Sequence, residues 1–194
     1  MKKKIILLVA LATGFLACNE STTKDSNDSA TVYSKESAED HNEAKFDNKA
    51  EKEAQFVVNA SSNHLTTIAL CNLAMERAVH SDVKTLAGEI KAQHANANRQ
   101  LEELAQLKGI SYPTQPDLDN SDYKSLDGKT GIDFDKAYYN RIVDLQKDAI
   151  QMYQEASTDL ADADLREYST HQLPSIRVQL DRSMDNKKVA ENWE

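Results

Sequence analysis

The stretch from Ser81 to Gly109 constrains the fold most, because it has the pattern of one long amphipathic helix. At about 100° of rotation per helical residue, its apolar side chains fall on one face roughly 120° wide, and Lys, Glu, Gln and Asn occupy the opposite face. His94 lies near the middle of the apolar face. A helix of this length needs partner helices to cover that face, so the sequence predicts a helical bundle.

Three further segments have the same apolar period, and they cover about 49–80, 133–157 and 162–186. A link of one or two residues precedes Ser81, and short links join antiparallel neighbours. Two Pro and two Gly mark a long connection over 110–133. We therefore predict an all-α, up-down-up-down four-helix bundle over residues 48–186, with a frayed C-terminal tail at 187–194.

The charge balance argues against one class of partner. The formal net charge is -9, and binding to nucleic acid needs a basic surface that neutralises phosphates. The low content of five Gly and three Pro in 194 residues also favours one helical domain over a sheet with many turns. We expect no binding to nucleic acid.

The N-terminus has the form of a secretory leader, and we interpret residues 1–17 as a signal peptide. Three lysines precede an apolar run that ends in Phe15-Leu16-Ala17-Cys18. A Cys after Leu-Ala resembles a bacterial lipobox, although Phe15 replaces the usual Leu. The pattern predicts lipid attachment at Cys18 and anchoring to the outer membrane, on either face. The alternative is an ordinary secreted protein in which Cys18 lies near the cleavage site by chance.

Residues 18–47 are rich in Ser, Thr, Asn, Asp and Glu and contain few large apolar side chains. Such a composition cannot bury enough surface to offset the entropy of ordering. We expect a flexible, disordered tether that holds the domain away from the membrane.

A polar layer is expected across the middle of the bundle. Counted from the two short turns at about 1.5 Å per residue, Thr67, His94, Gln146 and Gln179 lie within roughly one helical turn of the same height. His64 lies one turn beyond Thr67 on the same helix face.

Several spaced motifs resemble a known family: Leu73-Ala74, Val83-Lys84 through His94 to Leu104-Ala105, Phe134 to Tyr138, and Leu173-Pro174. Over roughly Phe56 to Met184, the chain resembles exported, ferritin-like bacterial domains of unknown function that are often labelled outer membrane proteins, here as a Bacteroidota-type lipoprotein member. The resemblance implies a ferritin-like bundle in the cell envelope and carries no established activity.

The same resemblance implies an acidic residue where this chain has Thr67, and His where it has Gln146 and Gln179. Only His94 retains the family residue. Because neutral side chains bind transition metals poorly, we expect no metal and no cofactor, and we interpret His94 as a core histidine bonded to Gln146, Gln179 or Thr67. The alternative is a metal ligand, with His64 as its second imidazole.

Cys71 lies on the inner face of its helix and is expected to be a small, unreactive core residue. No catalytic constellation is found, and we predict a lipid-anchored envelope protein with a structural or partner-binding role and no catalysis. Two alternatives stay open. One is a metal-binding ferritin-like envelope protein that uses His94 and His64. The other is a periplasmic stress or sensor module that binds a protein partner through its third and fourth helices.

Overall fold

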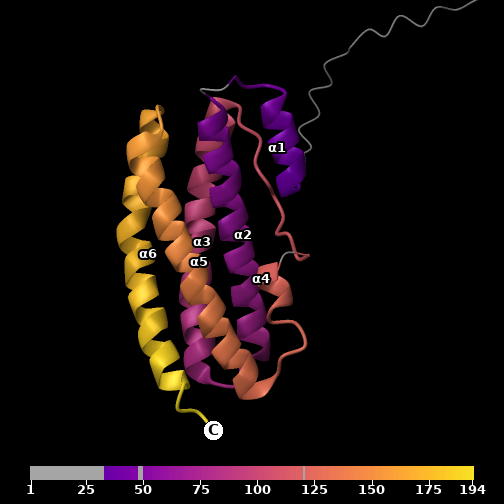
Figure 1. Cartoon of the computed structure of the whole chain (residues 1–194), viewed down its shortest axis with the longest axis vertical. Coiled ribbons are helices and arrows are strands. Elements are labelled where there is room, and N and C mark those ends of the chain that lie inside the picture. Colours follow the sequence, from indigo (N-terminus) through magenta and orange to yellow (C-terminus); the bar gives the residue numbers. More distant parts are fainter. Residues whose placement is uncertain (1–32, 48–49, 120) are drawn as a thin grey trace, which may run out of the picture. The chain divides into compact units, whose positions relative to one another are not determined.

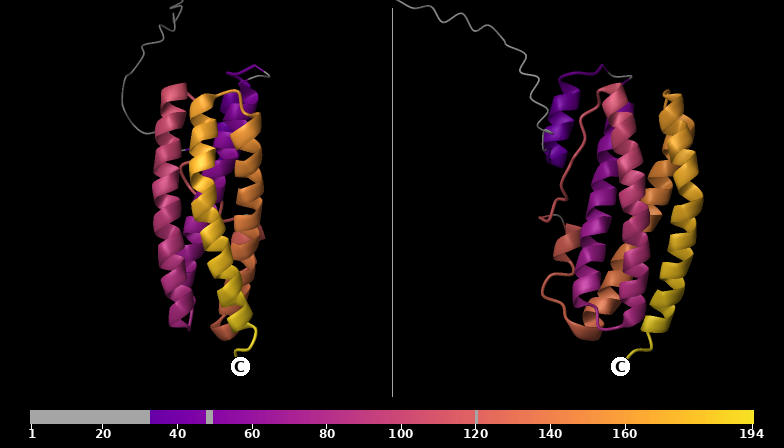
Figure 2. Two further views of the ribbon diagram at one scale, coloured as in Figure 1. Left: turned by 90° about the vertical axis from the view of Figure 1, so that its left-hand side faces the viewer. Right: turned by 180° about the vertical axis from the view of Figure 1, so that it is seen from behind.

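A computed structural model describes residues 33–47, 50–119 and 121–194, and these residues contain helices and no strand. Four long helices lie side by side (Figures 1 and 2), and they are α2 (Glu51–Arg77), α3 (Ser81–Lys108), α5 (Gly131–Asp159) and α6 (Ala163–Ala190). Two short helices, α1 (Lys35–Glu43) and α4 (Ser121–Lys124), accompany them. The all-α four-helix bundle is confirmed.

Local signals account for several helix ends. Helix α3 stops at Gly109, whose φ of 64° is the left-handed conformation that a residue without Cβ adopts readily. Helix α6 begins after Asp162, whose carboxylate accepts a hydrogen bond of 3.0 Å from the Leu165 N–H. Helix α5 begins at Gly131, with Thr130 as its N-cap, two residues before the start expected at about residue 133.

The order of helix directions differs from the expected up-down-up-down arrangement. The connection over 110–130 runs back along the bundle (Figure 1), so α5 starts beside the end of α2 and runs parallel to α3. The helices therefore run up, down, down, up, with the one long crossover typical of ferritin-like folds. About 20 extended residues reach some 65 Å, and a 28-residue helix is only about 42 Å long, so the connection spans the bundle with chain to spare.

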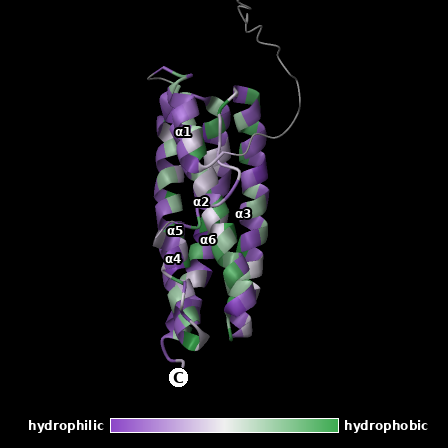
Figure 3. Ribbon diagram, turned by 90° about the vertical axis from the view of Figure 1, so that its right-hand side faces the viewer, coloured by the Kyte–Doolittle hydropathy of each residue, from purple (hydrophilic) through white to green (hydrophobic). Residues whose placement is uncertain are grey.

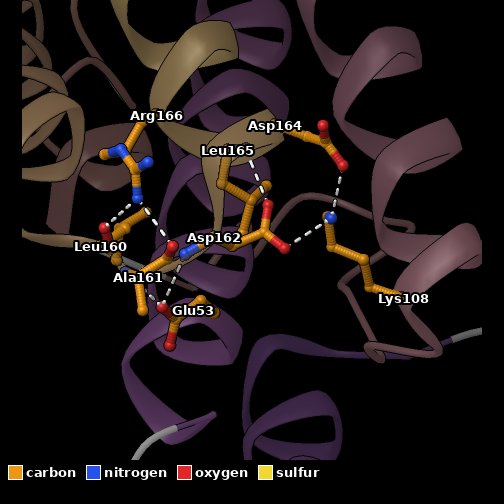
Figure 4. A network of polar contacts seen from close by, with 8 residues as sticks. All are labelled: Glu53, Lys108, Leu160, Ala161, Asp162, Asp164, Leu165 and Arg166. Atoms are coloured by element: carbon orange, nitrogen blue, oxygen red, sulfur yellow. Dashed lines mark hydrogen bonds and ion pairs between the residues drawn. The ribbon is translucent and has the colours of Figure 1, made fainter.

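Each helical hairpin supplies one buried carboxylate to the turn of the other hairpin. Asp135 of α5 accepts hydrogen bonds from the main-chain N–H groups of Val79 (3.2 Å) and His80 (2.9 Å) in the α2–α3 turn. At the other end, Glu53 of α2 accepts from the N–H of Ala161 at 2.7 Å in the α5–α6 turn (Figure 4). We call these two contacts the reciprocal caps. They place the two turns at opposite ends of the bundle.

Lys108 strengthens the end that Glu53 closes. Its ammonium group lies 2.6 Å from a carboxylate oxygen of Asp162 and 2.8 Å from one of Asp164 (Figure 4). These contacts join the last turn of α3 to the first turn of α6, and they hold the pKa of Asp162 below its usual value despite partial burial.

The apolar core consists of two clusters, one toward each end of the bundle. One cluster includes Leu70, Ile90 and Ile142, and the other includes Val57 and Leu101. Figure 3 shows hydrophobic and hydrophilic residues alternating along the long helices, as expected for helices with one buried face. Buried polar side chains lie between the two clusters.

Helix α1 occupies part of the segment that was expected to be a flexible tether. Ala38 and Asn42 are buried, and Asn42 makes two 2.8 Å hydrogen bonds with the main chain of Ser111. His41 also contacts the Ser111 hydroxyl at 3.0 Å, and Glu39 accepts a 3.0 Å hydrogen bond from Gln55. Polar contacts therefore dock much of this helix, whose composition is hydrophilic. The expected signal peptide, Cys18 and the part of the expected tether up to residue 32 lie outside the described residues. Within the described parts, no helix is both long and apolar enough to cross a membrane.

The C-terminus is ordered beyond the expected fraying point. Helix α6 continues to Ala190, and the Trp193 indole stacks on the His80 imidazole with ring centroids 3.6 Å apart. Lys136 donates a 2.9 Å hydrogen bond to the Trp193 carbonyl. The last turn is held because Trp193 supplies an aromatic surface that the helical period alone does not reveal.

We predict that Trp193→Ala lowers the free energy of unfolding by about 1 to 2 kcal/mol, because it removes a half-buried ring and its stacking contact. Urea denaturation followed by circular dichroism measures the change. Trp193→Phe keeps an aromatic ring and should lose less. Equal stability of wild type and Trp193→Ala would mean that the tail contributes nothing to the fold.

Candidate functional site

The two histidines of the expected polar layer contact each other directly. His64 of α2 and His94 of α3 are both buried, and their Nδ1 atoms lie 3.1 Å apart. The rings meet edge to face, with an interplanar angle of 77°. One partner of His94 is therefore His64, which lies one turn away from the level at which sequence counting placed the layer.

Two tyrosines complete this cluster from the other hairpin. The His64 Nε2 atom lies 2.8 Å from the Tyr153 hydroxyl and 3.0 Å from the Tyr168 hydroxyl, and the two hydroxyls are 3.3 Å apart. Tyr168 also donates to the carbonyl of Ala97 at 3.1 Å. These tyrosines were not singled out from the sequence. Their positions on the inner faces of α5 and α6 were the only signal of a further role.

One arrangement of protons satisfies all five contacts of the cluster. Tyr168 donates to the Ala97 carbonyl, and Tyr153 donates to Tyr168. His64 then donates from Nε2 to the two phenol oxygens and accepts at Nδ1 from the Nδ1–H of His94. If His64 instead carried its proton on Nδ1, its Nε2 atom and the Tyr168 hydroxyl would share no proton, because Tyr168 donates its own to Ala97. His94 is therefore left with a lone pair on Nε2.

Burial keeps all four side chains uncharged at neutral pH. Desolvation lowers the pKa of His94 to about 4, and it lowers the pKa of His64 well below its usual value, with repulsion from His94 as a second cause. Burial raises the pKa of both Tyr153 and Tyr168. The cluster is a neutral network of hydrogen-bond donors and acceptors.

The other members of the expected layer are buried in the same region and bond less completely. The hydroxyl of Thr67 and both amide atoms of Gln146 have no hydrogen-bond partner. Gln179 lies close to His94, and this contact raises the His94 pKa in part, against the lowering by burial. The geometry of the contact is irregular, and neither the Gln179 Oε1 atom nor the His94 Nε2 atom has a regular hydrogen bond. These residues are buried, as a polar layer requires, and Gln179 is one of the three partners expected for His94. The contact between His94 and His64 was not predicted as a hydrogen bond.

A cleft of about 290 Å³ opens between α3 and α6 and reaches both histidines. These two helices run side by side in opposite directions (Figure 2), and side-chain amides bridge them at two levels. Gln172 donates to Gln100 at 3.2 Å, and two helical turns away Gln179 donates to Gln93. Small side chains between the two bridges leave the space open.

The lining of the cleft is polar and contains no Lys, Arg, Asp or Glu. Its walls are formed by amides, a hydroxyl and imidazoles together with two apolar side chains: Gln93, Asn96, Ala97, Gln100, His171, Gln172, Ser175, Ile176 and Gln179, with His64 and His94 at the floor. His171 is at the exposed rim. The buried polar atoms at the floor are what distinguish this cleft from an ordinary groove between helices.

Among the residues that the structure describes, no group of three or more His, Cys, Asp or Glu side chains is placed to hold a metal ion. His64 and His94 supply two imidazoles, and the remaining polar neighbours are amides and hydroxyls. The arrangement can accept and donate hydrogen bonds at neutral pH.

Cys71 lies apart from this cluster, 3.4 Å from the Tyr138 hydroxyl, and burial raises the pKa of its thiol to about 12. We predict that Cys71 in a Cys18→Ser background does not react with Ellman's reagent at pH 8 until the protein is unfolded in guanidinium, because the thiolate is the reactive form. Absorbance of the released dye measures the reaction, and Cys71→Ala is the blank. Rapid reaction of the folded protein would contradict burial of this thiol.

With this geometry established, comparison with known proteins identifies the family. The model of a domain of unknown function, DUF4142, matches residues 35–185. The chain belongs to this family. The matched region begins at the first residue of α1, which places that helix inside the DUF4142 domain and outside any simple tether.

Solved structures support the fold of the DUF4142 domain. A DUF305 protein from Streptomyces coelicolor, described as a candidate secreted protein, is similar with a TM-score of 0.62 at 13% identity, covering 72% of this chain and 93% of that one. A conserved hypothetical protein from Mycobacterium tuberculosis gives 0.57 at 14% identity, with coverage of 72% and 98%. None of the curated proteins matches the chain. At these identities the likeness concerns the fold alone.

Proposed function

We propose that this DUF4142 protein is exported, anchored to the outer membrane through a lipid on Cys18, and binds a small molecule in the α3–α6 cleft without catalysing a reaction. The observation that carries the binding role is the floor of the cleft, where the His94 Nε2 and Gln179 Oε1 atoms are buried and without regular partners. Buried polar atoms are normally hydrogen-bonded, and a bound ligand would satisfy both.

The anchoring part of the proposal is supported by the cationic and apolar leader and by the position of Cys18 directly after Leu16-Ala17. Two or more acyl chains give stable attachment, because each buried methylene adds to membrane affinity. Growth of the producing cells with labelled palmitate tests this part. Label should enter the wild-type protein and be absent from Cys18→Ser, and equal labelling of both would rule out attachment at that residue.

The binding part is tested without knowing the ligand. The protein is purified from its own membranes, and native mass spectrometry records any small molecule retained at one per chain. Ala97→Leu, which fills the cleft, should lose that adduct. Ala95→Leu, an exposed change on the same helix, should keep it. An adduct retained equally by both variants would place the binding elsewhere.

A second candidate function is metal binding through His64 and His94. It is favoured by the 3.1 Å separation of their Nδ1 atoms and by lowered pKa values that keep both imidazoles unprotonated at neutral pH. Elemental analysis of protein purified without a histidine tag decides it. About one metal ion per chain, lost in His94→Ala, would replace the proposal above.

A further inference from the structure

We infer that the ligand of the α3–α6 cleft is a neutral, hydroxyl-rich molecule of the saccharide or polyol class, whose hydroxyl groups donate hydrogen bonds to His94 Nε2 and Gln179 Oε1. This inference rests on the proposed binding function and names its ligand class. It follows from the directions of the hydrogen bonds at the floor, the charge of the lining and the continuation of the cleft along the α3–α6 seam.

The floor of the cleft presents acceptors to a ligand. His94 uses its Nδ1–H toward His64, which leaves the Nε2 lone pair free. Gln179 uses its amide nitrogen toward Gln93, and its Oε1 atom lies near His94 without a hydrogen bond of regular geometry. A ligand that satisfies both atoms must therefore offer O–H or N–H donors, and a carboxylate or phosphate would meet two lone pairs instead.

The charge of the lining selects among donors. The cleft has no Lys or Arg to neutralise an anion and no Asp or Glu to neutralise a cation. Burying an unpaired charge here would cost more than burying a hydroxyl. A hydroxyl group both donates and accepts, which matches walls built from the amides of Gln93, Gln100 and Gln172.

The size and the continuation of the cleft indicate a ring or a short chain of rings. About 290 Å³ is at the small end of ligand sites, which are usually about 300 Å³ or larger. A second, more open hollow of about 390 Å³ continues along the same seam and shares Gln100, His171 and Gln172. It adds Leu104 and Tyr168, whose apolar surfaces suit the C–H face of a second sugar ring. Unlike the first cleft it also has carboxylates, those of Glu103, Asp164 and Glu167, which accept hydrogen bonds from hydroxyl groups.

Nitrogen-15 NMR of the full chain tests the inference with probes that differ in charge. Glucose, N-acetylglucosamine and trehalose are the neutral probes, glucuronate is the anion, glucosamine the cation, and Zn²⁺ the metal. The readouts are the Nε2 resonance of His94 and the side-chain amide of Gln179. At least one neutral probe should shift both in a saturable way, and bind at least tenfold more tightly than glucuronate or glucosamine.

Variants tie the response to the cleft. Ala97→Leu should abolish the shifts, and Ala95→Leu should leave them unchanged. If Ala97→Leu does not fold, Ser175→Leu at the opposite wall serves the same purpose. Tighter binding of glucuronate, glucosamine or Zn²⁺ at the cleft would overturn the ligand class and leave a binding function in place. Absence of any shift at His94 and Gln179 with every probe would overturn both.

Discussion

Replacement of Asp135 by Ala is expected to lower the free energy of unfolding by about 3 to 5 kcal/mol. The Asp135 side chain is fully buried, and its two oxygens accept from the N–H groups of Val79 and His80 and lie 2.7 Å from the His80 Nδ1 atom. Its removal leaves the partly buried main-chain donors of the α2–α3 turn without their acceptor, and donors that lose their partner inside a fold are costly. Urea denaturation at pH 7, followed by circular dichroism, measures the loss.

Two further variants separate this cap from the general effect of removing a carboxylate. Asp148→Ala changes an exposed residue on the same helix and should alter stability by no more than about 0.5 kcal/mol. Asp135→Asn keeps the shape but loses the charge, so it should fall between wild type and Asp135→Ala. If Asp135→Ala and Asp148→Ala unfold at the same urea concentration, Asp135 does not hold the two hairpins together.

The second large effect is a loss of stability in mild acid that depends on His94. Its pKa is about 4 in the folded protein and about 6.5 when unfolded, so between these values the unfolded chain binds the extra proton. Stability is therefore complete above about pH 6.5 and declines as the pH falls toward 4. The gap corresponds to about 3 kcal/mol when the decline is complete. His64 acts in the same direction, because its pKa is also lowered.

Comparison of wild type with His94→Gln at pH 8, 7, 6, 5 and 4.5 isolates this effect. Both proteins should show little change between pH 8 and 7. Below pH 6 the free energy of unfolding should fall more steeply for the wild type than for His94→Gln. The comparison concerns these slopes, so it does not require equal stability of the two proteins at pH 7. The measurements stay at pH 4.5 and above so that Asp162 does not contribute. Its pKa is lowered in the folded protein, so its protonation reduces stability only at more acidic pH. Parallel profiles for the two proteins would mean that His94 does not stay neutral in the fold.

The helical period predicted the buried residues well, because burial of one face is a local property of each segment. The buried polar residues include His64, His94, Gln146 and Gln179. They lie at similar heights in spite of the different helix directions, because each is near the middle of its helix. A residue at mid-helix stays at mid-height whichever way its helix runs. Its neighbours, however, depend on which helices are adjacent.

Those adjacencies could not be read from the sequence. The long connection over 110–130 can join helices in either direction, and only its actual path makes α3 and α6 neighbours. The cleft lies between these two helices, so it has no signature in either one alone. The pairing of His64 with Tyr153 and Tyr168 likewise joins residues of different hairpins.

The reciprocal caps have a consequence for how the chain reaches its native state. A hairpin of α2 and α3 alone lacks the acceptor for its own turn, and so does a hairpin of α5 and α6. Neither half is complete until it meets the other, so assembly of the bundle should be a single cooperative event. Because the crossover between Gly109 and Gly131 contributes to neither cap, two fragments divided there would each keep the carboxylate that the turn of the other fragment requires.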